Sequence, residues 1–240
     1  MPLCAIPRTY IAAARPLRGV DRSQITDYIS YVLIAVAKRL ITMRHIFIDH
    51  SNMWGGGRAA SKIEEPSLPE AKSRISVKNL GRILGGSKQG TTTKVVSGGV
   101  PPGLEGLWHQ YEQHGYNTQR LFRDKHWRER GVDHSIIGHM WRIVALHRGN
   151  PVEIVLASGD GKQNDFGTSF KEVLDEVLKR EGHDAVRVTL ASFDWETPRD
   201  APFRSPTSKR MRKLVEESER GKFINLMDHY SDLVYHERST

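Results

Sequence analysis

Residues 45–54 read His-Ile-Phe-Ile-Asp-His-Ser-Asn-Met-Trp, and the prediction of the fold begins from this stretch. Ile46, Phe47 and Ile48 form a short apolar run, and the polar cluster that begins at Asp49 ends it. A continuous apolar run that stops at a turn signal is typical of a buried strand in a parallel sheet. Ligands of open α/β sheets bind beyond the carboxyl ends of such strands, so Asp49 lies where a fold of this kind has its ligand-binding site.

Strand and helix patterns alternate about six times from residue 45 onward. This order predicts an α/β fold, a Rossmann-like three-layer α/β/α sandwich with a mostly parallel sheet. Further strands are expected at 93–97, 116–122, 152–157, 185–190 and 223–226, and helices at 75–84, 101–111, 133–144, 170–178, 207–219 and from 228.

The segments outside this alternation are polar or basic. Residues 58–74 predict a loop or a mobile lid, and residues 22–43 predict a packing helix. Residues 1–20 carry three arginines and no acid, which is the composition of a mitochondrial presequence or, more commonly, of a poorly ordered basic tail. We divide the chain into an N-terminal extension, residues 1–44, and one α/β domain, residues 45–240.

The composition favours an anionic partner. The 240 residues carry a formal net charge of +8, which favours nucleic acid, although a basic housekeeping domain can have the same charge. Cys4 is the only cysteine, which excludes an intramolecular disulfide and a thiolate zinc site of the usual kind. No apolar run reaches the about 18 residues of a membrane helix. We therefore expect no membrane partner and a place in the cytoplasm or nucleus.

Four acids are expected at one edge of the sheet. Asp49 and Asp160 follow buried strands, Asp133 begins a helix, and Asp165 can reach the same rim. Because strand ends and the helix starts that follow them share one edge of a doubly wound sheet, these side chains can meet in one cleft. Clustered carboxylates need a cation, and hard oxygen ligands select Mg²⁺ or Mn²⁺. Such a cation can activate water against a phosphodiester, so the pattern predicts a metal-dependent nuclease.

Each of these acids also has a purely structural interpretation. Asp133 can be the N-cap of its helix, Asp160 lies in an ordinary Gly-Asp-Gly turn, and Asp49 can form an Asx-turn. Turns and helix caps do not, however, require acids at the carboxyl ends of several strands. The occurrence of these acids together therefore favours the nuclease. His50 and His134 adjoin two of the acids, and we interpret both as local hydrogen-bonding groups.

Three short motifs in order carry a family resemblance. Ile-Asp-x-Ser-Asn ends the first strand, Gly-Val-Asp opens a central helix, and Ala-Ser-Gly-Asp follows a later strand. Val-Val-Ser-Gly-Gly and His-Gly-Tyr-Asn-Thr in the intervening sequence agree with the same pattern. The chain resembles the NYN domain of the PIN-like ribonuclease superfamily over roughly residues 45–230. This resemblance implies a PIN-like fold and Mg²⁺- or Mn²⁺-dependent endonucleolytic cleavage of RNA.

The resemblance also implies a role for each acid. Asp49 is expected to bind the metal, Asn52 to orient metal-bound water or the scissile phosphate, and Asp133 and Asp160 to complete the cluster.

The chain departs from the family after Asp160. Many members have a second Asp two residues further on, where this chain has Lys162, and Asp165 comes three residues later. Either Asp165 takes the catalytic and metal-binding role or the fourth acid is missing.

Basic and aromatic residues are expected to hold the RNA. Residues 123–130 interleave them, which suits backbone neutralisation and base stacking on a single strand. A solvated loop is the alternative. The expected RNA contacts are Ser51, Arg123, Lys125, Trp127, Arg128, Arg130 and Lys162.

Two other functions compete with the nuclease. Lys162 leaves room for a catalytically inactive RNA-binding or adaptor protein on the same fold. A phosphatase or nucleotide-binding enzyme ranks third, because Ser51 stands where a haloacid-dehalogenase-type phosphatase needs its second Asp. The phosphate loop and the Gly-x-Ser-x-Gly elbow are also absent from the sequence.

Overall fold

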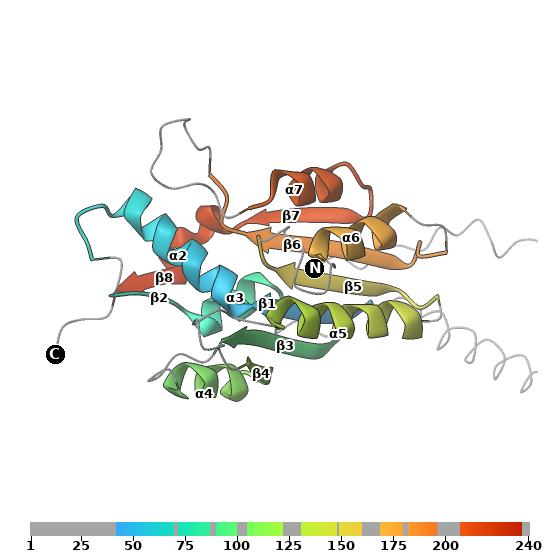
Figure 1. The fold of residues 1–240 in the computed structure, drawn as a ribbon, viewed down its shortest axis with the longest axis horizontal. Helices are drawn as coiled ribbons and strands as arrows, with labels where there is room; N and C mark the ends of the chain where they lie inside the picture. The colour runs from blue at the N-terminus through green and yellow to red at the C-terminus, as the bar shows by residue number, and fades with distance from the viewer. Residues whose placement is uncertain are drawn as a thin grey trace, which may run out of the picture. The chain divides into compact units, whose positions relative to one another are not determined.

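A six-stranded parallel sheet forms the centre of the α/β unit, which spans Ile41–Thr240 (Figure 1). The strand order is β4-β3-β1-β5-β6-β7, and every pairing in this sheet is parallel, which confirms the predicted fold class. The strands are β1 (Met43–Asp49), β3 (Thr91–Gly99), β4 (Asn117–Leu121), β5 (Val152–Ala157), β6 (Val186–Ser192) and β7 (Gly221–Asn225). The computed structural model describes residues 42–69, 72–86, 90–99, 105–121, 131–147, 149–159, 169–179, 182–195 and 207–236.

The strand order reverses between β1 and β5. The chain adds β3 and β4 on one side of β1, and then returns to add β5, β6 and β7 on the other side. This is the doubly wound order whose ligands bind at the reversal point, beyond the carboxyl ends of the strands. A ligand site is therefore expected at the carboxyl ends of β1 and β5.

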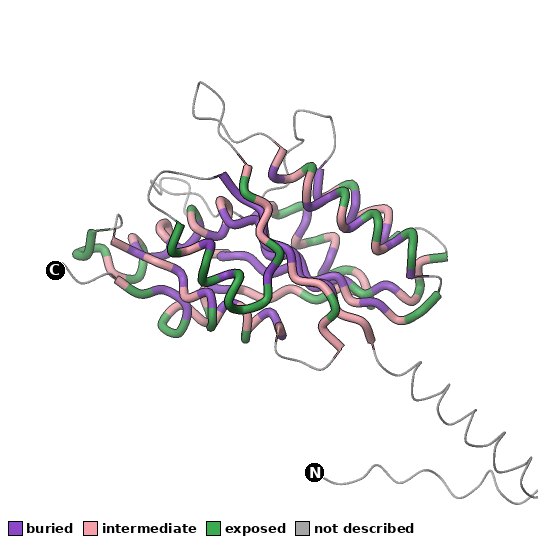
Figure 2. Tube along the Cα trace, turned by 90° about the horizontal axis from the view of Figure 1, so that it is seen from below, coloured by how far each residue is buried: buried purple, intermediate pink, exposed green. Residues whose placement is uncertain are grey.

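Helices cover both faces of the sheet. One core joins Phe47 to α5 (Val132–Leu146), α6 (Phe170–Lys179) and α7 (Lys209–Glu216). The other core joins Ile46 and Ile48 to α2 (His50–Glu64), α3 (Val77–Ile83) and α4 (Glu105–Gln113). Successive strand side chains point to opposite faces, so one continuous apolar run supplies both cores. Figure 2 shows the buried residues gathered along the strands and the exposed ones on the outer sides of the helices.

The predicted loop or lid at residues 58–74 is wrong for much of its length. α2 continues through the glycine run to Glu64, and β2 (Ser73–Ile75) follows. The glycines allow a close approach that the local sequence does not reveal. A Cβ atom on Gly56 would lie 2.8 Å from the Phe193 ring, and one on Gly57 would lie 3.0 Å from Ile75. The run therefore forms a helix face that packs against distant side chains.

The C-terminal segment differs from the predicted helical tail. After η3 (Leu226–His229) and α8 (Tyr230–Leu233), β8 (Val234–His236) pairs antiparallel with β2. Glu65, just past α2, accepts hydrogen bonds from the Tyr230 hydroxyl at 2.6 Å and His236 Nε2 at 2.7 Å, and these bonds lower the pKa of its carboxyl. This polar group joins the C-terminal segment to the end of α2.

The other predicted elements agree in type with the structure where it describes them. Of the predicted helix 22–43, Met43 lies in β1 instead, and residues 22–41 lie outside the described residues. None of the described helices is long and apolar enough to cross a membrane.

Two adjacent glycines of α2 provide a matched test of this packing. Gly56→Ala is expected to destabilise the protein by about 1–3 kcal/mol, because its new methyl group overlaps the buried Phe193 ring. Gly55→Ala meets nothing within 4 Å and is expected to stabilise the helix by roughly 0.5–1 kcal/mol. Urea unfolding of both variants measures the difference, and equal shifts of the midpoint would contradict the packing described for α2.

Candidate functional site

Asp49 is both the last residue of β1 and the N-cap of α2. Its Oδ1 atom accepts a hydrogen bond from the backbone N–H of Asn52 at 3.0 Å. This bond satisfies one of the N–H groups that a helix start leaves without a partner in the helix. The bond reaches the third residue on and is an N-cap bond, not the bond to the second residue that defines an Asx-turn, and it fixes the carboxylate at the carboxyl edge of the sheet.

The reversal point joins Asp49 to the segment that follows β5. The Ser158 hydroxyl donates to Asp49 Oδ2 at 3.1 Å, and the Gly159 N–H donates to Asn52 Oδ1 at 2.7 Å. The Asp49 side chain is only 4% exposed. A carboxylate has about four lone-pair sites, so it can accept these bonds and also bind a cation.

The Asn52 side chain has a positioning role that the sequence did not predict. Because Asn52 Oδ1 accepts from Gly159, the amide nitrogen is the end of this side chain that can orient a water or a phosphate. Ser51, expected to touch RNA, lies in the first turn of α2 and is half-buried.

A row of polar side chains crosses the carboxyl ends of five neighbouring strands. Asp49 pairs in register with Ser97 of β3, and Ser192 of β6 pairs with Asn225 of β7. Ser158 follows β5 and takes the next position between them, as the β1–β5 and β5–β6 registers require. Strand side chains alternate between the two faces of the sheet. The residues of this polar row therefore lie on the face that α5, α6 and α7 cover, just beyond the last core residues of their strands.

Two hydroxyl groups of the polar row are buried without a hydrogen bond from the described residues. Ser97 and Ser192 are both 0% exposed, and their Oγ atoms have no partner in the described part of the chain. Buried polar groups are usually satisfied by protein, water or an ion. The Ser97 hydroxyl lies on the strand next to Asp49, so the edge that carries the carboxylate also offers a further oxygen donor.

Asp133 lies in the first turn of α5 rather than at its N-cap. The N-cap is Gly131, whose φ of +84° favours glycine, so the N-cap interpretation of Asp133 is wrong. α5 packs on β1 and β3, on the same face as the polar row. Its N-terminus lies beside Leu121, the last residue of β4. The structure thus brings the first turn of α5 to the edge of the sheet that carries Asp49.

The described residues contain no group of three His, Cys, Asp or Glu side chains that could hold a metal ion. The remaining expected members of the acidic cluster, Asp160 and Asp165, lie outside the described residues. The remaining expected RNA contacts also lie outside them: Arg123, Lys125, Trp127, Arg128, Arg130 and Lys162.

His50, next to Asp49, belongs to an aromatic cluster on the opposite face of the sheet. Its Nδ1 atom lies 3.3 Å from the Tyr111 hydroxyl, and its ring packs against Trp108 with centroids 5.3 Å apart. Gly98 at the end of β3 permits this approach, since a Cβ there would lie 3.0 Å from the His50 Cβ. Burial lowers the pKa of His50 to about 4, which keeps the ring neutral. As predicted, His50 has a local hydrogen-bonding role.

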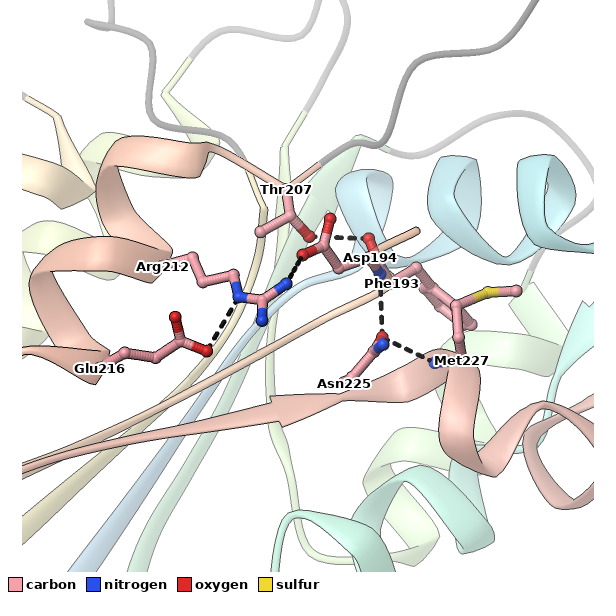
Figure 3. Close-up of polar contacts among 7 residues, drawn as sticks. All are labelled: Phe193, Asp194, Thr207, Arg212, Glu216, Asn225 and Met227. Atoms are coloured by element: carbon pink, nitrogen blue, oxygen red, sulfur yellow. Dashed lines mark hydrogen bonds and ion pairs between the residues drawn. The ribbon is translucent and has the colours of Figure 1, made fainter. Parts of the chain in front are cut away.

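The start of α7 lies next to this site, which the sequence did not predict. The N-cap residue of α7, Ser208, donates its backbone N–H to the Gly159 carbonyl at 2.8 Å. The preceding Thr207 hydroxyl donates to the Phe193 carbonyl at 2.7 Å, beyond the end of β6 (Figure 3). The first of these bonds attaches the basic start of α7 to Gly159, the residue whose N–H Asn52 also accepts. Only tertiary hydrogen bonds reveal this arrangement.

Comparisons with known proteins give no functional assignment for this site. No family model matches the chain, and no curated protein matches it. A protein of unknown function from Vibrio parahaemolyticus is similar in structure at 13% sequence identity, with a TM-score of 0.44 over 78% of this chain and 94% of that chain.

The buried His50 predicts a pH dependence of stability. Its pKa is about 4 in the folded protein and 6.5, the ordinary value of histidine, in the unfolded chain, so the unfolded chain binds the extra proton between these pH values. The free energy of unfolding therefore rises with pH through this window, by about 3 kcal/mol in total.

His50→Phe removes this titration but keeps an aromatic ring in the cluster. Urea unfolding of both proteins across the window is expected to show a shallower pH dependence in the variant. His45 and His147, whose pKa values burial also lowers, are present in both proteins. Identical pH dependence in the two proteins would contradict the burial of a neutral His50.

Proposed function

We propose that the chain is a metal-dependent RNA endonuclease of the NYN type, within the PIN-like superfamily. The observation that carries this proposal is the fixed position of Asp49. Its carboxylate lies at the reversal point of a doubly wound sheet, held by the Asn52 N–H and the Ser158 hydroxyl. Ligands of such sheets bind at this point. The net charge of +8 supports an anionic polymer as substrate.

The donor atoms at this edge fit Mg²⁺ or Mn²⁺. In this proposal Asp49 and Asp133 would supply carboxylates, and Ser97 would supply a buried hydroxyl that has no hydrogen-bond partner among the described residues. Hard oxygen ligands of this kind suit these cations, whereas the neighbouring imidazole of His50 faces the aromatic cluster. When bound, the cation supplies an activated water and neutralises charge on the phosphate.

The protein's own residues position the reacting groups in this proposal. Asp49 holds the cation, with Asp133 and the acids that follow β5 completing its ligands. The Asn52 amide donates to the attacking water or to a phosphate oxygen. Burial and two hydrogen bonds prevent Asp49 from changing rotamer, so its charge is preorganised.

Asp49→Asn tests the assignment with little disturbance of the fold. Asparagine is as good an N-cap as aspartate, so α2 is expected to keep its start while the charge is lost. Cleavage of a fluorescent single-stranded RNA in Mn²⁺ is expected to fall by at least about 100-fold. Asp175→Asn on α6, whose carboxylate pairs with Lys179, is the control and is expected to retain full activity.

The metal dependence of the parent protein completes this experiment. EDTA is expected to abolish cleavage, and Mn²⁺ to restore it. Cleavage that survives Asp49→Asn unaltered, or that proceeds equally well in EDTA, would contradict the proposed centre.

An inactive RNA-binding protein on the same fold is the second candidate. Lys162 favours it, because this residue stands where many family members have their second acid. Salt-sensitive RNA binding without turnover in Mn²⁺ supports this candidate over the nuclease, and no RNA binding at low salt contradicts both.

A further inference from the structure

A cavity of about 500 Å³ opens between α7 and the carboxyl ends of β6 and β7. Its lining includes Trp195 and Asn225, together with three bases and three acids: Lys209, Arg212, Lys213, Asp194, Glu216 and Glu217. Small-molecule sites commonly have volumes of roughly 300–1,000 Å³, so this cavity, the α7 pocket, can hold one nucleotide.

A network of polar contacts holds the side chains at the wall of the α7 pocket (Figure 3). Arg212 donates to Asp194 at 2.5 Å and to Glu216 at 2.9 Å, and its guanidinium lies 4.9 Å from the Phe223 ring centroid. Asn225 Oδ1 accepts the backbone N–H of Asp194 at 3.0 Å and that of Met227 at 3.1 Å. The single charge of Arg212 offsets one of these two carboxylates, and the Asn225 bonds fix the backbone that leads into Trp195.

Two lysines on one face of α7 remain to bind an anion. Lys209 has no salt-bridge partner among the described residues, and Lys213 lies one turn further on, 3.6 Å from Glu217. Both members of that pair are more than 60% exposed, so the pairing holds Lys213 only weakly.

The charge order along α7 is the reverse of what a helix favours. Lys209, Arg210 and Arg212 lie in its first turn, and Glu216 and Glu217 lie at its end. A helix dipole favours acids at the start and bases at the end. This order does not complement the helix dipole, although the i, i+4 ion pairs Arg212–Glu216 and Lys213–Glu217 offset part of the cost. A bound anion at the basic start would offset the remainder.

The α7 pocket also lies along the edge that carries Asp49. Ser208, which precedes Lys209, is bonded to the Gly159 carbonyl, and Gly159 is bonded to Asn52. β7 lies three strands from β1, a span of roughly 14 Å at the usual strand spacing. A single RNA strand that crosses this edge can reach both places at once.

We propose that the α7 pocket binds one nucleotide of the RNA, with its phosphate on Lys209 and Lys213 and its base against Trp195. The proposal rests on the RNA substrate of the proposed function. A partly buried indole beside two ammonium groups matches the combination of base stacking and phosphate neutralisation with which proteins hold single strands.

Fluorescence anisotropy of a short fluorescein-labelled single-stranded RNA tests the proposal. The full chain carries Asp49→Asn and is kept in EDTA, so that binding is measured without turnover. Lys209→Ala with Lys213→Ala is expected to weaken binding about tenfold and to reduce the slope of log K against log salt by about 0.7, the value of one phosphate contact. The control pair, Lys179→Ala with Lys222→Ala, removes the same charge from the last residue of α6 and the amino end of β7, neither of which lines the pocket.

Trp195→Ala tests the base contact separately. Affinity is expected to fall about tenfold with the salt slope unchanged, since stacking releases no counterions. Trp195→Phe, which keeps an aromatic ring, is expected to restore most of the affinity, and this rescue excludes misfolding as the cause.

The outcomes separate this proposal from the proposed nuclease. Equal weakening by the two lysine pairs, or full affinity of Trp195→Ala, overturns the pocket even if the parent protein cleaves RNA in Mn²⁺. Selective loss of binding in the pocket variants supports the pocket even if the parent protein does not cleave. No binding of the RNA at low salt by the parent protein overturns both.

Discussion

One buried carboxylate joins the two halves of the sheet. Asp49 ends β1, caps α2 through the Asn52 N–H, and accepts a hydrogen bond from Ser158 beyond β5. Burying a charge costs free energy unless hydrogen bonds compensate it. The strand end, the helix start and the segment after β5 must therefore keep one arrangement around this side chain. The residue that fixes the reversal point of the sheet is also the one to which we assign the chemistry.

The same arrangement extends to α7 through a single residue, Gly159. Gly159 donates its N–H to Asn52 and accepts the N–H of Ser208, so the starts of α2 and α7 are both bonded to it. Carboxylate and hydroxyl oxygens of the polar row suit a cation, while the lysines at the start of α7 suit a phosphate. Both kinds of group lie along one edge of the sheet, which the RNA strand of our proposal would cross.

The sequence predicts most of the sheet but little of the packing around it. Buried parallel strands leave continuous apolar runs, so residues 46–48 and 152–157 were correctly identified as strands. The extent of α2 was missed because its glycines fit against Phe193, a contact that local sequence does not show. β8 was missed because its partner strand is distant in the chain. The sequence predicts the position of Asp49 at the end of a strand, whereas only the register of the strands shows the polar row.

Anomalous diffraction from crystals of the full chain grown with Mn²⁺ locates the metal itself. We expect a manganese peak within bonding distance of the Asp49 carboxylate, beside the first turn of α5, and its loss in crystals of Asp49→Asn. A peak bonded elsewhere, or no peak at Asp49 while its hydrogen bonds to Asn52 and Ser158 are intact, would contradict the assignment of this carboxylate as the metal-binding centre.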